Sequence, residues 1–155
     1  MARPVCSTLT LTIRLAKSAA EIDDAAQLYV RSGRAAFTWR SGTHFRAEDF
    51  AMYALDEEVW LALMGGALVG ILSIFRPENF VHCLYVDPDA QRLGIGRALV
   101  EHVRRAAGAP LTLKLDVPNR QAIAFYEATG WERMTGLDDQ GVDDFGIKWA
   151  RYRLA

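Results

Sequence analysis

The sequence has few cysteines and no long apolar run. Its two cysteines, Cys6 and Cys83, match no metal-ligand or redox spacing. Isolated thiols of this kind are typical of proteins from a reducing compartment. No apolar stretch approaches the roughly 20 residues of a membrane span, and the first residues contain no apolar signal core. We therefore expect a cytoplasmic protein without a membrane partner.

An excess of charge of either sign is also lacking. The 18 Lys and Arg residues nearly balance the 19 Asp and Glu residues, which leaves a net charge of −1. Because no basic field surrounds such a protein, nucleic acid is not an expected partner, and an anionic ligand needs a local site. The 155 residues are 51% hydrophobic and 24% charged, as in an ordinary globular domain. We predict one domain over residues 1–155, with about residues 1–8 flexible.

Hydrophobic periodicity predicts strands that alternate with helices. Ser18 and Glu21 have capping-box spacing at a helix start, and Gly65-Gly66 is typical of a hairpin turn. We expect strands at 9–15, 59–64, 67–75, 80–86, 111–117, 131–135 and 145–154, and helices at 19–37, 46–55, 94–107 and from 120 to Gly130. This order indicates an α/β fold (α+β mixed sheet), with helices on both faces of the sheet.

The most informative segment joins the strand at 80–86 to the helix at 94–107. A buried strand runs into a loop that contains Gly94 and Gly96, and a helix begins there. Glycine lets the backbone pack directly against a ligand, and the free N–H groups of a first helical turn favour an anion. The pattern predicts a pyrophosphate site. The alternative is that the two glycines only permit a tight strand-to-helix turn.

Two common phosphate loops do not fit this segment. A Walker loop needs Lys-Ser/Thr where Arg97-Ala98 stands, and the dinucleotide fingerprint needs a third glycine at the position of Leu99. What remains is a Gln-x-x-Gly-x-Gly pattern at residues 91–96, preceded by Leu-x-Val-x-Pro at residues 84–88. This pattern resembles the loop that binds the pyrophosphate and pantetheine arm of acetyl-CoA in the GNAT (Gcn5-related N-acetyltransferase) family.

A second segment, from Asn119 to Trp131, gives an independent comparison. It resembles the GNAT motif Asn-x-x-Ala-x-x-Phe-Tyr-Glu-x-x-Gly-Phe, with Trp131 in place of the usual phenylalanine. Asn119 is well placed as a helix N-cap, and Ala122 and Tyr126 share one helical face. The alternative is that Phe125 and Tyr126 are core aromatics and that Asn119 is only a cap. The two motifs together cover about a fifth of the chain.

The resemblance implies an acetyl-CoA-dependent N-acetyltransferase without a metal, which acetylates the primary amine of a small molecule by direct attack in a ternary complex. It also implies a twisted, mostly antiparallel sheet whose fourth and fifth strands splay apart around the pantetheine arm. Leu84 N–H would face the thioester oxygen, the main chain of Val86 would hold the pantetheine amide, and Tyr126 would protonate the departing thiolate. Cys83 would point to the opposite face from Leu84, so no covalent intermediate is expected. The implied cofactor contacts are Leu84, Tyr85, Val86, Gln91, Arg92, Leu93, Gly94, Ile95, Gly96, Arg97, Asn119, Ala122, Phe125 and Tyr126.

The base that deprotonates the acceptor is less well defined by the sequence. An alkyl amine with a pKa of about 10.4 is only about 0.04% neutral at pH 7, so the reaction benefits from a base. His82 is the leading candidate, because period-two alternation places it on the same side of its strand as Leu84. Glu78, Asp56 or a chain of waters are alternatives. A histidine in a strand is also often a half-buried, hydrogen-bonded residue without a catalytic role.

The acceptor pocket is expected to involve the first two helices and the late loop. These segments contribute the aromatic residues Tyr29, Phe37, Trp39, His44, Phe45 and Tyr53 and the acidic run at residues 138–144. They suit a cationic amine, or else the aromatics fill the core and the acidic run is a solvated loop. His44 and His102 are expected at the surface, with no metal cluster around His82.

Two other functions and one assembly remain open at this point. The enzyme could instead acetylate a protein N-terminus or a lysine, or the domain could bind acyl-CoA without catalysis. The C-terminal strand is apolar and aromatic. Pairing of this strand with a second copy would give a homodimer.

Overall fold

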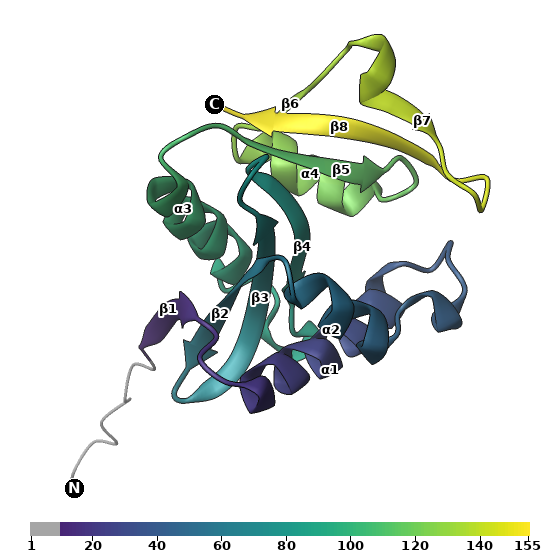
Figure 1. Cartoon of the computed structure of the whole chain (residues 1–155). Helices are drawn as coiled ribbons and strands as arrows, with labels where there is room; N and C mark the ends of the chain where they lie inside the picture. The colour runs from purple at the N-terminus through teal and green to yellow at the C-terminus, as the bar shows by residue number, and fades with distance from the viewer. Residues whose placement is uncertain (1–9) are drawn as a thin grey trace, which may run out of the picture.

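The computed structural model describes residues 10–155, so the expected flexible start at residues 1–8, together with Leu9 and Cys6, lies outside the described part. Every predicted helix and strand is present within three residues of its expected ends (Figure 1). The elements are β1 (Leu11–Leu15), α1 (Ala19–Ala36), α2 (Ala47–Ala54), β2 (Glu58–Met64), β3 (Ala67–Phe75), β4 (Phe80–Val86), α3 (Ile95–Ala107), β5 (Leu111–Asp116), α4 (Arg120–Ala128), β6 (Glu132–Arg133), β7 (Gln140–Val142) and β8 (Lys148–Leu154).

The predicted start of α1 and the predicted hairpin turn are confirmed. Ser18 Oγ accepts the N–H of Glu21 at 3.2 Å, and the Glu21 carboxylate accepts the N–H of Lys17 at 2.7 Å. Gly65 and Gly66 both have positive φ angles, 58° and 81°, which is the backbone that a tight two-residue hairpin turn between β2 and β3 requires.

The strands form one mixed sheet in the order β1-β2-β3-β4-β5-β8-β6, and β7 also pairs with β8. All pairs are antiparallel except β4 with β5, which is parallel and short. Only Phe80 with Thr112 and Val81 with Leu113 are in register there. Beyond these residues β5 and β8 turn away from β3 and β4 (Figure 1). The predicted splay of the fourth and fifth strands is therefore confirmed.

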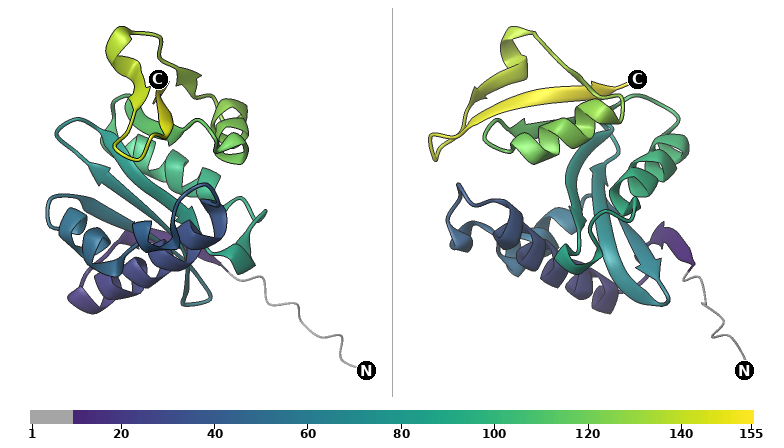
Figure 2. Two further views of the ribbon diagram at one scale, coloured as in Figure 1. Left: turned by 90° about the vertical axis from the view of Figure 1, so that its right-hand side faces the viewer. Right: turned by 180° about the vertical axis from the view of Figure 1, so that it is seen from behind.

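Helices cover both faces of the sheet, and each face has its own apolar core. α1 and α2 lie on one face, where Leu28, Phe50 and Ile71 are buried, and α3 lies on the other, where Ile95 and Leu99 are buried (Figure 2). α4 packs on the same side as α3, through Tyr126, which contacts Trp131 with a ring separation of 5.3 Å.

The late acidic segment contains more structure than the sequence suggested. Residues 140–142 form β7, which pairs with β8 from Ala150 to Lys148, and the other edge of β8 pairs with β5 along its whole length. β6 covers the remaining end of β8 at Arg153 and Tyr152. Because both edges of β8 are occupied within the chain, this strand has no free edge on which a second copy could pair, and a homodimer stays an untested prediction.

Candidate functional site

The gap between β4 and β5 leaves part of the β4 main chain without a strand partner. The N–H of Asp87 donates to the carbonyl of Val69 on β3 at 2.8 Å, which makes this a hydrogen-bonded pair. Since pairs alternate along an antiparallel ladder, the Leu84–Leu72 and Val86–Gly70 pairs are non-hydrogen-bonded, and the amides of Leu84 and Val86 point away from β3. Pairing with β5 has already ended at Val81, so the Leu84 N–H faces the gap.

A bulge in β4 changes the direction of His82. The β3–β4 register shifts so that Cys83 lies opposite Ser73 and Val81 opposite Ile74, which leaves His82 without a cross-strand partner. His82 lies with Cys83 and Tyr85 around a cavity on the face of α1 and α2, whereas Leu84 packs into the core beside α3. The prediction that His82 shares a side with Leu84 and Val86 is therefore wrong, because one extra residue reverses the alternation. The expected opposite orientation of Cys83 and Leu84 is confirmed.

His82 lies beside a carboxylate that the sequence did not single out. Its Nδ1 is 3.0 Å from Oε1 of Glu57, whose side chain is 10% exposed. Among residues 10–155 neither His82 Nδ1 nor Glu57 Oε2 has a hydrogen-bond partner, so the two side chains are close without a well-aligned bond. The ring of Tyr53 packs edge-on against the imidazole at a centroid distance of 4.3 Å. The alternative bases, Asp56 and Glu78, are exposed and do not line this cavity.

This inner cavity has a volume of about 220 Å³ and spans the gap between the two halves of the sheet. From the α1–α2 face and β4 it is lined by Tyr29, Phe37, Arg40, His44, Phe45, Tyr53, His82, Cys83 and Tyr85, and from β5 and the start of α4 by Lys114, Leu115, Asp116 and Asn119. Burial raises the pKa of Tyr29, Tyr53 and Tyr85, so these phenols stay protonated at neutral pH. Burial also raises the pKa of the Cys83 thiol, to about 12, which makes it a poor nucleophile.

Five of the six predicted acceptor aromatics line the inner cavity, and the sixth, Trp39, lies at an adjoining one. Tyr29 and Phe45 are also buried in the core. These two residues therefore both line the cavity and fill the core. His44 is half-buried rather than a surface residue, and burial lowers its pKa. His102 packs against Trp60, with a ring separation of 5.1 Å.

The loop before α3 is shaped by main-chain geometry and by two side chains that hold the end of β4. The Val86 carbonyl accepts from Gln91 Nε2 at 2.9 Å and from Ser32 Oγ at 3.2 Å. Arg92 and Gly94 have positive φ angles of 65° and 75°, so the chain turns sharply just before the helix. A positive φ angle strongly favours glycine, so the tight strand-to-helix turn is enough to explain Gly94.

Gly96 has no such conformational requirement. It lies in the first turn of α3 with ordinary helical geometry, and a Cβ there would meet Phe125 at 3.5 Å and Val86 at 3.6 Å, which are normal contact distances. Protein packing therefore accepts alanine at this position, and the turn does not explain the glycine. Close approach of a ligand to the main chain, which the sequence predicts here, stays a prediction.

The remaining loop residues divide between the core and the surface. Ile95 is 1% exposed and packs in the core, so only its main chain faces the loop. Arg92 and Leu93 are exposed, and Arg97 Nε lies 3.2 Å from Oε1 of Glu101, one helical turn further on. The main chain of Tyr85 pairs with Ile71, and its side chain points into the inner cavity rather than toward the loop.

The second motif forms α4 as expected. Asn119 Oδ1 accepts the N–H of Ala122 at 3.1 Å, which confirms the N-cap. Ala122 and Phe125 are half-buried, and Tyr126 is 6% exposed. Burial raises the pKa of Tyr126, so its phenol stays protonated at neutral pH. Asn119 reaches the inner cavity, whereas Tyr126 lies behind it on the face shared with α3.

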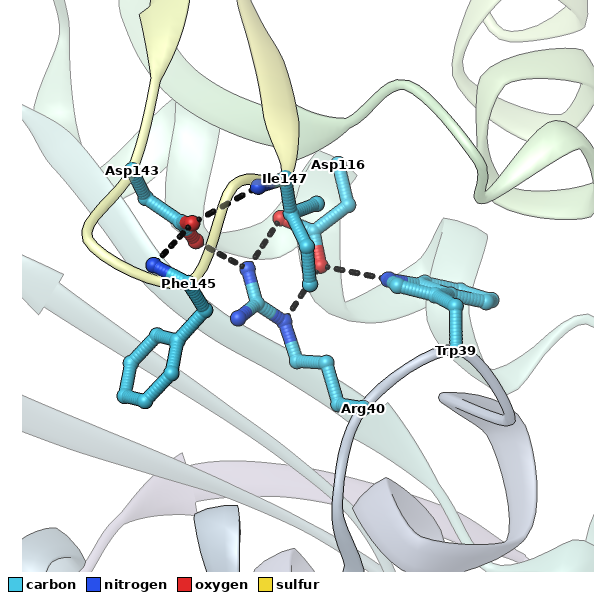
Figure 3. A network of polar contacts seen from close by, with 6 residues as sticks. All are labelled: Trp39, Arg40, Asp116, Asp143, Phe145 and Ile147. Carbon is cyan, nitrogen blue, oxygen red and sulfur yellow. Dashed lines mark hydrogen bonds and ion pairs between the residues drawn. The ribbon is translucent and has the colours of Figure 1, made fainter.

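A polar network links the segment after α1 to the C-terminal half of the sheet (Figure 3). Arg40 donates to both carboxylate oxygens of Asp116, at 2.7 and 2.8 Å, and to Asp143 at 2.8 Å. Trp39 Nε1 also donates to Asp116, at 2.9 Å. The side chains of Arg40 and Asp116 are only 9% and 13% exposed, so the network forms a largely desolvated wall of the inner cavity.

The network gives a prediction about stability. Asp116→Ala removes the acceptor of Trp39 Nε1 and of two Arg40 donors and leaves a nearly buried guanidinium with one partner. We expect unfolding to become easier by about 2 kcal/mol, because orphaned buried donors cost more than the lost bonds themselves. Urea denaturation followed by tryptophan fluorescence measures this. An exposed ion pair, removed by Glu101→Ala, is the control and should change the stability by less than about 0.5 kcal/mol.

Metal and membrane features complete the description of the site. Over residues 10–155, no group of three or more His, Cys, Asp or Glu side chains is arranged to hold a metal ion. In the same residues, no helix has the length and apolarity needed to cross a membrane.

Comparison with known sequences identifies a family that matches most of the chain. The model of the family described as Acetyltransferase (GNAT) family matches residues 22–131. Peptidyl-lysine N-acetyltransferase YjaB from Escherichia coli (strain K12) is 39% identical over 72 residues, which cover 46% of this chain and 46% of YjaB. Ribosomal protein bS18-alanine N-acetyltransferase from the same strain is 37% identical over 73 residues, 44% of this chain and 49% of that enzyme. The chain spans about half the length of the curated relatives it matches.

Solved structures share the whole fold. The solution structure of apo YjaB from Escherichia coli has a TM-score of 0.76 at 23% identity and covers 94% of this chain and 98% of that one. The PaiA N-acetyltransferase from Thermoplasma acidophilum, solved in complex with coenzyme A, has a TM-score of 0.75 at 14% identity, with the same coverage of 94% and 98%. At these identities the likeness concerns the fold.

Proposed function

Because the chain belongs to the GNAT acetyltransferase family, we propose that it transfers an acetyl group from acetyl-CoA to the primary amine of a small molecule by direct attack in a ternary complex. The observation that carries this proposal is the unpaired stretch of β4, where the Leu84 N–H faces a gap bordered by the glycine loop. A cavity that contains His82 adjoins the same stretch from the other face. The proposal includes a cytoplasmic location, which stays a prediction.

The residues present fit acetyl-CoA. The first-turn N–H groups of α3 are free to hold a diphosphate, and the bare main chain at Gly96 allows it to come close. Val86 presents an amide toward the gap, where an extended amide-containing chain can pair with it as a strand does. When bound, acetyl-CoA supplies an activated acetyl thioester. The Leu84 N–H would donate to the thioester oxygen, and Tyr126 would donate a proton to the sulfur.

His82 is our proposed base, with Glu57 as the residue that positions it. The imidazole would accept the proton of the amine, so its loss should slow the chemical step more than it weakens acceptor binding. We expect His82→Gln to lower kcat by about 100-fold and to change KM for the acceptor by less than about threefold. Glu57→Gln should lower kcat by about tenfold with a similarly small change in KM. Steady-state CoA release gives kcat and KM for both variants.

A matched variant separates catalysis from packing around His82. Tyr53→Phe keeps the ring that packs against the imidazole and removes only a hydroxyl, so its kcat should match that of the unmodified enzyme. If His82→Gln keeps the full rate, the base is another group, with a chain of waters as the remaining option.

An amino group of a peptide is a second candidate acceptor. It is favoured by the names of the two curated relatives, which act on peptidyl lysine and on the alanine of a ribosomal protein. The walls of the inner cavity instead favour a small acceptor, because the network of Arg40, Asp116 and Asp143 joins the two halves of the sheet across one end.

Two measurements test the proposal together. Acetyl-CoA binding is measured by calorimetry, and CoA release is followed over a panel of small amines, lysine-containing peptides and peptides with free N-termini. Turnover with small amines supports the first candidate, and turnover with peptides alone supports the second. Tight binding without turnover across the whole panel contradicts both and favours an acyl-CoA-binding module.

A further inference from the structure

A second, outer cavity lies next to the inner one. Its volume is about 360 Å³, and it is lined by Trp39, Arg40, Ser41, Thr43, His44, Phe145 and Ile147. Arg40 and His44 line both the inner and the outer cavity, so the two adjoin there. A molecule that extends from His82 past Arg40 would therefore enter the outer cavity.

Arg40 offers the outer cavity a hydrogen-bond donor. Its Nε and Nη2 are used by Asp116 and Asp143, but Nη1 has no partner among residues 10–155 (Figure 3). The two carboxylates are already supplied with donors, since Asp143 Oδ1 also accepts the N–H groups of Phe145 and Ile147 at 2.9 Å each. Within the described part of the chain, the side chains that line the outer cavity include no Asp or Glu. What remains free is a fixed guanidinium N–H, which suits an oxygen on the ligand.

Phe145 offers the same cavity an apolar surface. Its ring is 73% exposed, although its main chain is held by Asp143 in a defined turn. The ring of His44 meets it edge-on at 5.6 Å. The lowered pKa of His44 keeps this neighbour neutral, so the wall carries no additional charge. An exposed aromatic ring on a braced turn contributes little to the core and is well placed to pack against a bound molecule.

We propose that the outer cavity is the specificity subsite for the acceptor and that it selects amino-acid-type amines. In this arrangement an acyl oxygen of the acceptor accepts a hydrogen bond from Arg40 Nη1, an apolar or aromatic side chain packs on Phe145, and the amine reaches His82. The inference rests on the proposed function and adds the acceptor class to it. A free amino acid and a peptide or amide share this chemistry, and simple polyamines lack it.

Three matched acceptors test the two contacts separately. Phenylalaninamide has the ring and the acyl oxygen, phenethylamine has only the ring, and glycinamide has only the oxygen. We expect kcat/KM for phenylalaninamide to exceed that for each of the others by about tenfold or more. Phe145→Ala should remove the advantage of phenylalaninamide over glycinamide. Arg40→Lys should remove the advantage over phenethylamine. Free phenylalanine, compared with phenylalaninamide, shows whether a carboxylate or an amide is preferred.

Leu137→Ala is the control, because this side chain is 95% exposed and lies outside both cavities. It should leave all three acceptors unchanged. A direct measurement that needs no turnover is the calorimetric binding of N-acetylphenylalaninamide to the CoA complex, which Phe145→Ala should weaken by about tenfold.

The outcomes for the subsite and for the proposed function are distinguishable. Equal kcat/KM for the three acceptors, or no binding of N-acetylphenylalaninamide to the unmodified protein, overturns the subsite while acetyl transfer to other amines still stands. Binding of the acetylated amide without turnover of any amine supports the subsite and contradicts the proposed function.

Discussion

Tyr126→Phe should lower kcat by about 100-fold and leave the affinity for acetyl-CoA within about twofold. The phenol lies on α4 on the face shared with α3, it is 6% exposed, and burial raises its pKa, so it carries its proton throughout the neutral range. Loss of the hydroxyl removes a proton donor but keeps the ring that packs against Trp131 at 5.3 Å. Pre-steady-state CoA release and calorimetry give kcat and affinity separately.

Tyr85→Phe is the informative comparison for this variant. Tyr85 is also a buried phenol with a raised pKa, but its side chain points into the inner cavity on the opposite face of β4. We expect Tyr85→Phe to change kcat by less than about threefold, because its ring, not its hydroxyl, forms the cavity wall. If Tyr126→Phe keeps full turnover and Tyr85→Phe does not, the proton comes from the cavity side.

Elements with a strong local signal could be predicted from the sequence. The start of α1 depends on Ser18 and Glu21, three residues apart, and the β2–β3 turn on Gly65-Gly66. The N-cap of α4 depends on Asn119 and an amide three residues later. In each case the residues that determine the structure are neighbours in the chain, so the pattern and the structure carry the same information.

The direction of His82 could not be predicted, because it depends on a bulge. Strict alternation assigns His82 to the side of Leu84, and the register shift at Ser73 and Ile74 of the neighbouring strand reverses this. A bulge inserts one residue without a local sequence signal such as a glycine, so it appears only when two strands are paired. Glu57 was missed for the same reason, since its contact with His82 joins two separate segments.

The polar network illustrates the limit for long-range contacts. Arg40 is 76 residues from Asp116 and 103 residues from Asp143, and nothing near Arg40 in the sequence indicates these partners. The acidic segment looked like a solvated loop because its composition is polar, yet β8 supplies an edge on which β7 forms. Tertiary pairing overrode the local propensity in that segment.

Gly96→Asp should abolish measurable acetyl-CoA binding, a loss of at least about 100-fold, without loss of fold stability. Gly96 is the second residue of α3, where a carboxylate interacts favourably with the helix dipole and replaces a flexible glycine. The same carboxylate would stand where the diphosphate is proposed to bind, and two like charges at contact distance repel strongly even near water. Stability and ligand affinity should thus change in opposite directions.

Two control variants accompany Gly96→Asp. One adds volume at position 96 without charge, and the other adds the same charge at the start of a different helix. Gly96→Ala adds a methyl group at 3.5 Å from Phe125, and it should weaken acetyl-CoA binding by about tenfold through steric exclusion alone. Ala20→Asp places the same carboxylate at the second residue of α1, far along the sheet from the gap, and should leave binding unchanged. Thermal unfolding with and without acetyl-CoA reads both quantities in one experiment, since a ligand raises Tm only for a protein that binds it. If Gly96→Asp keeps the full ligand-induced shift, the diphosphate does not lie at the start of α3, and the glycine there has another cause.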